Sequence, residues 1–133
     1  MRLLLAEDNE LNSEIAEMLL TDAGAQVTIV RDGQQAVNTF AEHPAGTYDA
    51  ILMDIMMPNM DGITATRAIR ALDRPDAAGI PIIAMTANAF DDDAKECFEA
   101  GMNAHLSKPL QIDTMLAAIS EFTVKNNSKQ GDK

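Results

Sequence analysis

The chain has 133 residues, of which 47% are hydrophobic and 23% are charged. This length and composition are typical of one globular domain and exclude the disordered and fibrous classes. Ten Lys and Arg against 21 Asp and Glu leave a net charge of −11, which repels the phosphate backbone of nucleic acids. No apolar run reaches the roughly 18 residues of a membrane span. We therefore expect a cytoplasmic protein that neither binds nucleic acid nor inserts into a membrane.

Apolar segments alternate with segments of helical pattern along the chain. The apolar segments cover residues 2–6, 26–30, 50–53, 81–85 and 104–107. The helical segments cover about residues 11–23, 32–42, 63–72, 91–100 and 110–122. Parallel strands need crossover connections, and helices supply them. The pattern therefore predicts an α/β fold, with a doubly wound five-stranded parallel sheet covered by five helices.

The first helical segment has an apolar stripe. Leu11, Ile15, Met18 and Leu19 recur at offsets of three and four, and Gly24 follows as a left-handed stop. This spacing predicts that the stripe is the face of the helix that packs on the sheet.

Two acidic positions are typical of helix starts. Asp32 and Gln35 form a capping-box pattern, and Asp61-Gly62 combines turn chemistry with a cap. We expect both positions to form turns and helix caps and to have no catalytic part.

Polar side chains stand where four of the predicted strands end. Glu7 and Asp8 follow the first strand, Asp54 the third, Thr86 the fourth and Lys108 the fifth. In such a sheet, ligands bind outside the carboxyl ends of the strands. Three carboxylates in one place repel one another, which a shared proton or a hard divalent cation relieves. Mg²⁺ fits best, because it takes one or two carboxylates together with phosphate oxygens.

The combination of these residues points to phosphoryl chemistry. A lysine and a hydroxyl facing the metal would bind the remaining oxygens of a phosphoryl group. Asp54 would then be the nucleophile that forms an aspartyl-phosphate. Each residue alone would more often be a helix cap or a surface charge, so the interpretation depends on the set.

Over about residues 1–123 the sequence resembles the receiver domain of two-component response regulators. The stretches that carry the resemblance are LLLAEDN, DAILMDIMMPNMDG, PIIAMTANAF and AGMNAHLSKPL. EDNELN, MTANAF and AGMNAHLSKP also resemble the receivers of hybrid sensor histidine kinases. The resemblance implies a flavodoxin-like sheet of order 2-1-3-4-5. It leaves residues 124–133 as a polar, flexible tail.

The resemblance also assigns roles at the metal site. It implies that Asp54 is the phosphoacceptor and that Asp8 binds Mg²⁺ directly. Glu7 would bind the ion through water, and Met56 through its backbone carbonyl.

Further roles follow from the same resemblance. Thr86 and Lys108 would contact the phosphoryl oxygens, and the Lys108 to Pro109 peptide is a candidate cis bond. His105 stands where many receivers carry a Tyr or Phe that moves on phosphorylation, and Met56 would shield the phosphoryl group from water. The positions with an expected switching or modulating role are Met56, Ala87, Asn88, His105 and Pro109.

The implied partners are proteins. The donor would be a phosphohistidine on a sensor histidine kinase or on a histidine phosphotransfer domain. Phosphorylation would draw Thr86 and Lys108 inward and change the face made by residues 87–100 and 104–122, where an unidentified protein would bind. We expect no enzymatic turnover beyond slow self-dephosphorylation, in a chain that acts through protein contacts alone or as one module of a longer protein.

Three other functions were compared with this one. A phosphorylation-independent binding module would use the same fold to bind a protein without accepting a phosphoryl group. A Mg²⁺-dependent aspartyl-phosphate hydrolase typically has a second Asp two residues after its nucleophile, where this chain has Met56. A flavin carrier on the same sheet order needs a hydroxyl-rich phosphate loop, whereas Glu7-Asp8-Asn9 would repel a phosphate.

Overall fold

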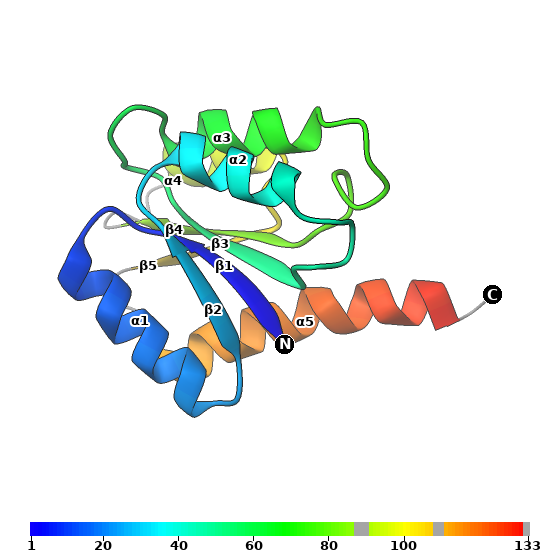
Figure 1. The fold of residues 1–133 in the computed structure, drawn as a ribbon, viewed down its shortest axis with the longest axis horizontal. Coiled ribbons are helices and arrows are strands. Elements are labelled where there is room, and N and C mark those ends of the chain that lie inside the picture. Colours follow the sequence, from blue (N-terminus) through cyan, green and yellow to red (C-terminus); the bar gives the residue numbers. More distant parts are fainter. Residues whose placement is uncertain (87–90, 108–110, 132–133) are drawn as a thin grey trace.

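The computed structural model of the chain describes residues 1–86, 91–107 and 111–131, and in this part strands and helices alternate throughout (Figure 1). The strands are β1 Arg2–Ala6, β2 Gln26–Val30, β3 Ala50–Asp54, β4 Ile82–Thr86 and β5 Ala104–Ser107. The helices are α1 Glu10–Asp22, α2 Gly33–Glu42, α3 Gly62–Arg70, α4 Asp91–Ala100 and α5 Ile112–Gly131.

The strands form one parallel sheet in the order β2-β1-β3-β4-β5. This confirms the predicted α/β fold and its doubly wound strand order. The register pairs Ala6 with Val30 and with Met53, and Asp54 with Met85. The carboxyl ends of the strands therefore meet along one edge of the sheet, which is where the polar residues of the sequence pattern stand.

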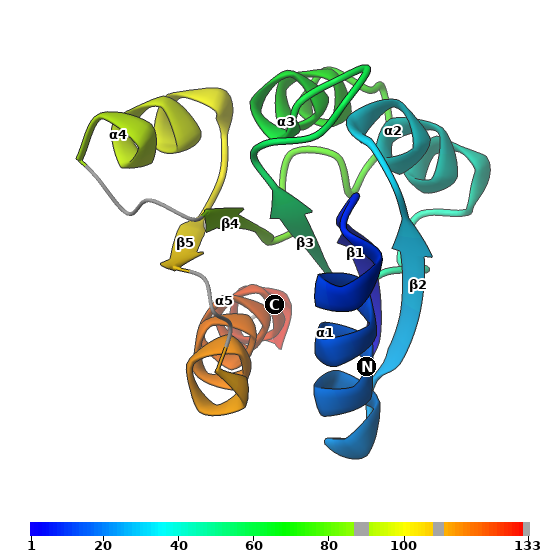
Figure 2. The same ribbon diagram turned by 90° about the vertical axis from the view of Figure 1, so that its left-hand side faces the viewer.

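The helices cover both faces of the sheet, with α1 and α5 on one side and α2, α3 and α4 on the other (Figure 2). Alternate side chains of each strand belong to the two resulting core layers. Leu4 and Ile51 lie in the layer of α2 to α4, whereas Leu3 and Leu52 lie in the layer of α1 and α5. All four are fully buried, and each such side chain contributes about 1.5–3 kcal/mol through burial.

The buried face of α1 differs from the predicted one. Ser13, Ala16 and Leu20 are its buried residues. Leu11 and Met18 are 65% and 66% exposed, and Ile15 is exposed as well, while Leu19 is half-buried. The prediction that Leu11, Ile15, Met18 and Leu19 form the core face is wrong.

The reason is that α1 packs through small side chains. Ser13 and Ala16 are buried, so two small side chains form much of the face that this helix turns toward the core. Burial of the Ser13 hydroxyl is compensated, because it donates to the Glu10 carbonyl at 2.8 Å and accepts from Arg31 Nη1 at 2.7 Å. A buried serine interrupts an apolar pattern, so periodicity alone selects the wrong stripe.

Side-chain caps begin three of the helices. The Asn9 side chain accepts from the N–H of Asn12 at 2.9 Å and starts α1. Asp32 accepts from the N–H of Gln35 at 2.8 Å at the start of α2. Asp61 does the same for α3, with the N–H of Thr64 at 2.7 Å. The capping roles predicted for Asp32 and Asp61 are confirmed.

Helix α5 continues where the sequence analysis expects a polar tail. It runs to Gly131, because residues 112–130 contain neither glycine nor proline to end it. The backbone there is helical and not irregular, while the domain boundary at residue 123 and the flexibility of the tail stay predictions. Among the residues that the structure describes, no helix is both long and apolar enough to cross a membrane.

Candidate functional site

Three carboxylates gather at the carboxyl edge of the sheet. Glu7 and Asp8 follow β1, and Asp54 is the last residue of β3, the strand beside it. One carboxylate oxygen from each of the three lies within 4.8 Å of the others. The structure therefore brings together the acids that the sequence pattern placed at two different strand ends.

The cluster is buried on one side and open on the other. Asp54 and Glu7 are each 2% exposed, whereas Asp8 is exposed. Close carboxylates cannot all stay ionised in a buried place without compensation, and oxygen ligands in this number suit a hard divalent cation. The exposed Asp8 leaves the site accessible from solvent.

The loop after β3 contacts Asp54 directly. The backbone N–H of Met56 donates to Asp54 Oδ1 at 3.2 Å. This bond helps to fix the orientation of the Asp54 carboxylate beside those of Glu7 and Asp8. The Met56 side chain is 76% exposed and stands beside the site without covering a core.

Gly62 allows α3 to begin against the end of β3. A Cβ at this position would collide with the backbone carbonyl of Asp54. The Gly62 N–H also donates to the carbonyl of Ile55 at 3.0 Å. The interpretation of Asp61-Gly62 as turn chemistry is therefore incomplete, because the glycine is also needed for this close approach.

A second contact holds the same loop, and the sequence analysis did not find it. Asn59 has a φ of 65° and donates from Nδ2 to Asp32 Oδ2 at 2.8 Å. This bond is the largest cause of the lowered pKa of the Asp32 carboxyl, followed by the bond from the backbone N–H of Gln35. Asn after Pro58 is a signal for a left-handed turn residue, but its partner lies 27 residues away and no local pattern indicates it.

A cation also lies next to the acids. Arg31 follows β2, and its Nη1 donates to the backbone carbonyl of Glu7 at 3.4 Å as well as to Ser13. Arg31 thus joins the segment that carries the acids to α1, a role that the sequence analysis missed.

The remaining predicted residues lie toward β5. Thr86 is buried at the end of β4, one strand away from Asp54. His105 on β5 meets the ring of Phe98 edge-on, with the centroids 6.2 Å apart. The predicted residues that lie outside the described part are Ala87, Asn88, Lys108 and Pro109.

Comparison with known proteins decides the family. Residues 3–120 match the response regulator receiver domain. The chain belongs to this family. Among the relatives of this receiver, Hybrid signal transduction histidine kinase I of Dictyostelium discoideum is 40% identical over 90% of the chain, and Transcription factor SKN7 of Candida albicans is 39% identical over 97%. The receiver spans 7% of the first protein and 22% of the second.

Solved structures agree with this assignment. The receiver domain of a sensor histidine kinase from Pseudomonas aeruginosa PAO1, which has a magnesium ion in its active site cleft, is 41% identical with a TM-score of 0.82. The match covers 92% of this receiver and 96% of that chain. These findings confirm the predicted family and fold.

Proposed function

We propose that this receiver is the phosphoacceptor switch of a two-component phosphorelay. The observation that carries the proposal is the buried carboxylate of Asp54, one oxygen of which lies within 4.8 Å of an oxygen of Glu7 and of an oxygen of Asp8. A related solved complex supports it. The receiver domain of the Saccharomyces cerevisiae response regulator Ssk1, crystallised with the histidine phosphotransfer protein Ypd1, is 28% identical with a TM-score of 0.84, over 95% of this chain and 90% of that one.

The cluster fits Mg²⁺. Asp8 and Asp54 would bind the ion directly, the Met56 carbonyl would add a backbone ligand, and Glu7 would bind through water. The likeness to the magnesium-bound Pseudomonas aeruginosa receiver supports this set. When bound, the ion would offset the negative charge of the carboxylates and of an incoming phosphoryl group.

The residues of the chain then act in one displacement step. The Oδ2 oxygen of Asp54 attacks phosphorus while the bond from phosphorus to the imidazole nitrogen of a donor phosphohistidine breaks. The electron pair of that bond stays on the imidazole, which takes up a proton from solvent. The Met56 N–H holds the other oxygen of Asp54 in place. Thr86 and Lys108 would contact the phosphoryl oxygens.

Loss of the phosphoryl group needs only water. Attack on phosphorus by water would release inorganic phosphate and restore the Asp54 carboxylate, which is the slow self-dephosphorylation implied by the family. The exposed Met56 side chain stands beside Asp54, where it would hinder that water.

The exposed apolar face of α1 fits the donor protein. Leu11, Ile15 and Met18 project from the helix that begins just after Asp8, so a protein docked there would reach the acid cluster. Exposed apolar side chains that form a contiguous patch are typical of protein interaction sites. We expect Met18→Asp to slow transfer from a phosphorylated histidine protein and to leave reaction with a small phosphodonor unchanged. Equal rates with the protein donor would exclude this face.

A second face would carry the signal onward. Phe98 on α4 is 51% exposed and contacts His105 on β5, so an aromatic patch lies on the face predicted for the partner. Movement of Thr86 at the end of β4 would reach this patch through the neighbouring strand. The partner on this face would be a protein, and we place the switch in the cytosol, as the family suggests.

Intact-mass spectrometry tests the function. The chain is incubated with a small-molecule phosphodonor and Mg²⁺, beside Asp54→Asn and a chelator-treated sample. We expect a Mg²⁺-dependent gain of one phosphoryl group, about 80 Da, that the variant loses. No gain in the native chain would favour a phosphorylation-independent binding module. Steady release of phosphate from added phosphate esters would favour a hydrolase.

A further inference from the structure

We infer that Asp32 and Asn59 are positioning residues for the phosphoacceptor site. Neither touches the reacting atoms. Their contact would fix the loop between β3 and α3 in the shape that presents the Met56 backbone to Asp54 and to the metal. The inference rests on the proposed function and adds residues to which the family resemblance gave no catalytic part.

The start of α2 holds this loop through two adjacent residues. Asn59 donates from Nδ2 to Asp32 Oδ2 at 2.8 Å, and the N–H of Gly33 donates to the carbonyl of Met60 at 2.9 Å. A Cβ at Gly33 would collide with that same carbonyl, so the helix start and the loop are in close contact. The loop cannot shift at this point without breaking both bonds.

An asparagine at position 59 indicates a role for its side chain, because the backbone conformation alone does not require it. Asn59 has a left-handed φ of 65°, a conformation that glycine adopts without strain. Glycine would thus satisfy the turn, whereas asparagine adds an amide that reaches a buried carboxylate. A bond from an amide to an ionised, buried acceptor such as Asp32 is stronger than one between neutral groups.

The other end of the loop is tied to the site itself. The N–H of Met56 donates to Asp54 Oδ1 at 3.2 Å, and the N–H of Ile55 donates to the carbonyl of Met85 at 3.1 Å. Met56 therefore lies between two fixed points, Asp54 on one side and Asn59 on the other. A change at Asn59 should alter how the Met56 N–H and carbonyl face the acid cluster.

The decisive variants exchange the two functional groups. Asn59→Asp sets a carboxylate against that of Asp32 and should push the loop away by repulsion. The double variant Asp32→Asn with Asn59→Asp restores the bond in reverse, because the new amide can still cap α2 with its oxygen and donate with its nitrogen. The matched control is Asn38→Asp, the same change at an exposed position of α2.

The readout that separates positioning from charge is the Mg²⁺ dissociation constant, measured by calorimetry without phosphodonor. Added negative charge alone would strengthen Mg²⁺ binding, so a weaker affinity in Asn59→Asp can only come from geometry. We expect that variant to lose affinity by about tenfold and to be phosphorylated more slowly, as altered outer-shell contacts do at metal sites. The exchanged pair and Asn38→Asp should stay within about twofold of the native chain.

Several outcomes would overturn the inference. A lower melting temperature with unchanged Mg²⁺ affinity would make the contact merely structural. If Asn59→Asp does not fold, Asn59→Gly keeps the turn and removes the amide, and native-like Mg²⁺ affinity in that variant would also refute the role. If the native chain is phosphorylated and the variants equal it in Mg²⁺ affinity and in phosphorylation rate, the positioning role alone is refuted. A native chain that neither binds Mg²⁺ nor accepts a phosphoryl group would refute the proposed function and this inference together.

Discussion

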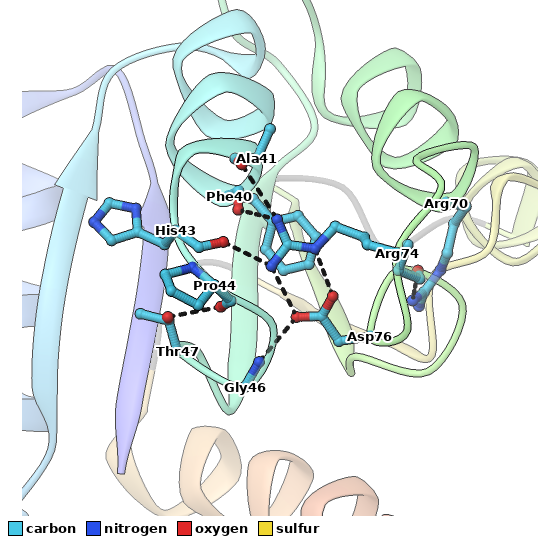
Figure 3. A network of polar contacts seen from close by, with 10 residues as sticks. Phe40, Ala41, His43, Pro44, Gly46, Thr47, Arg70, Arg74 and Asp76 are labelled. Carbon is cyan, nitrogen blue, oxygen red and sulfur yellow. Dashed lines mark hydrogen bonds and ion pairs between the residues drawn. The ribbon is translucent and has the colours of Figure 1, made fainter.

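Arg74 forms an ion pair with Asp76, with 2.6 Å between Nε and Oδ1, and it closes the end of α2 (Figure 3). Its Nη1 donates to the carbonyl of Phe40 and its Nη2 to that of His43, both at 2.8 Å. The guanidinium also lies 4.4 Å over the ring of Phe40. The last carbonyls of a helix have no hydrogen-bond donor within the helix, and here one arginine donates to several carbonyls at the helix end.

We expect Arg74→Met to destabilise the fold without affecting the switch. The change keeps an unbranched apolar stem but removes the donor of the carbonyls and the charged donor of Asp76, which keeps the Gly46 N–H, at a cost of about 2–3 kcal/mol in the free energy of unfolding. Urea denaturation measures this cost. Arg67→Met is the control, because Arg67 is exposed, and it should change stability by less than about 0.5 kcal/mol. Equal effects of the two variants would contradict the assignment, as would a slower phosphorylation of Arg74→Met.

Stability should fall in acid because two carboxyl groups have lowered pKa values. Burial raises the pKa of Asp76, but bonds from Arg74 and Gly46, with the charge of Arg74, lower it by more. For Asp32 the bond from Asn59 lowers the pKa. Such groups stabilise the fold above their unfolded pKa, near 3.9, and lose that contribution as the pH falls through the folded value.

Urea denaturation between about pH 6 and pH 3 measures this effect. We expect the free energy of unfolding of the native chain to fall from about pH 4 downward, and more gently in Asp76→Asn. Asp22→Asn on the exposed side of α1 is the control and should follow the native curve. A curve for Asp76→Asn that is as steep as the native one would show that Asp76 gives no such contribution.

The two faces of α1 should respond differently to truncation. Leu20 is fully buried, so Leu20→Ala should cost about 2–5 kcal/mol in the free energy of unfolding. Met18→Ala removes an exposed side chain and should cost less than about 0.5 kcal/mol. Chemical denaturation compares the two. The reverse order would mean that the predicted stripe, and not the observed one, packs on the sheet.

The strands and the acid cluster could be predicted from the sequence because both follow from simple rules. Buried parallel strands are short apolar runs, and β1 and β5 begin and end where those runs do. Polar residues that end such runs must meet at one edge, which places Glu7, Asp8 and Asp54 together without any knowledge of distances.

The missed features depend on contacts between distant segments. The buried face of α1 includes Ser13, and burial of this hydroxyl is compensated by Arg31 from a different element. The bond from Asn59 to Asp32 joins a loop to the start of α2. Hydrophobic periodicity and turn propensity are local signals, so neither could indicate these partners.

Gly62→Ala should damage both the fold and the site. The added Cβ would collide with the Asp54 carbonyl and force α3 and β3 apart, at a cost of about 1–3 kcal/mol. Displacement of Asp54 should also weaken Mg²⁺ binding. Gly79→Ala is the matched control, since a Cβ there meets no atom within 4 Å. We expect it to leave denaturation midpoint and Mg²⁺ affinity close to native, and an equally mild Gly62→Ala would disprove the close approach.

Mg²⁺ should stabilise the folded chain through the acid cluster. A ligand that binds only the folded state adds about 2.7 kcal/mol of stability at 100 times its dissociation constant. Thermal unfolding with and without Mg²⁺ measures the gain. Asp8→Asn should abolish most of this gain, because the variant lacks a proposed direct ligand. Without metal, the variant should be at least as stable as the native chain, because one source of carboxylate repulsion is gone. An equal Mg²⁺ gain in Asp8→Asn and in the native chain would show that the ion binds somewhere other than beside Asp54.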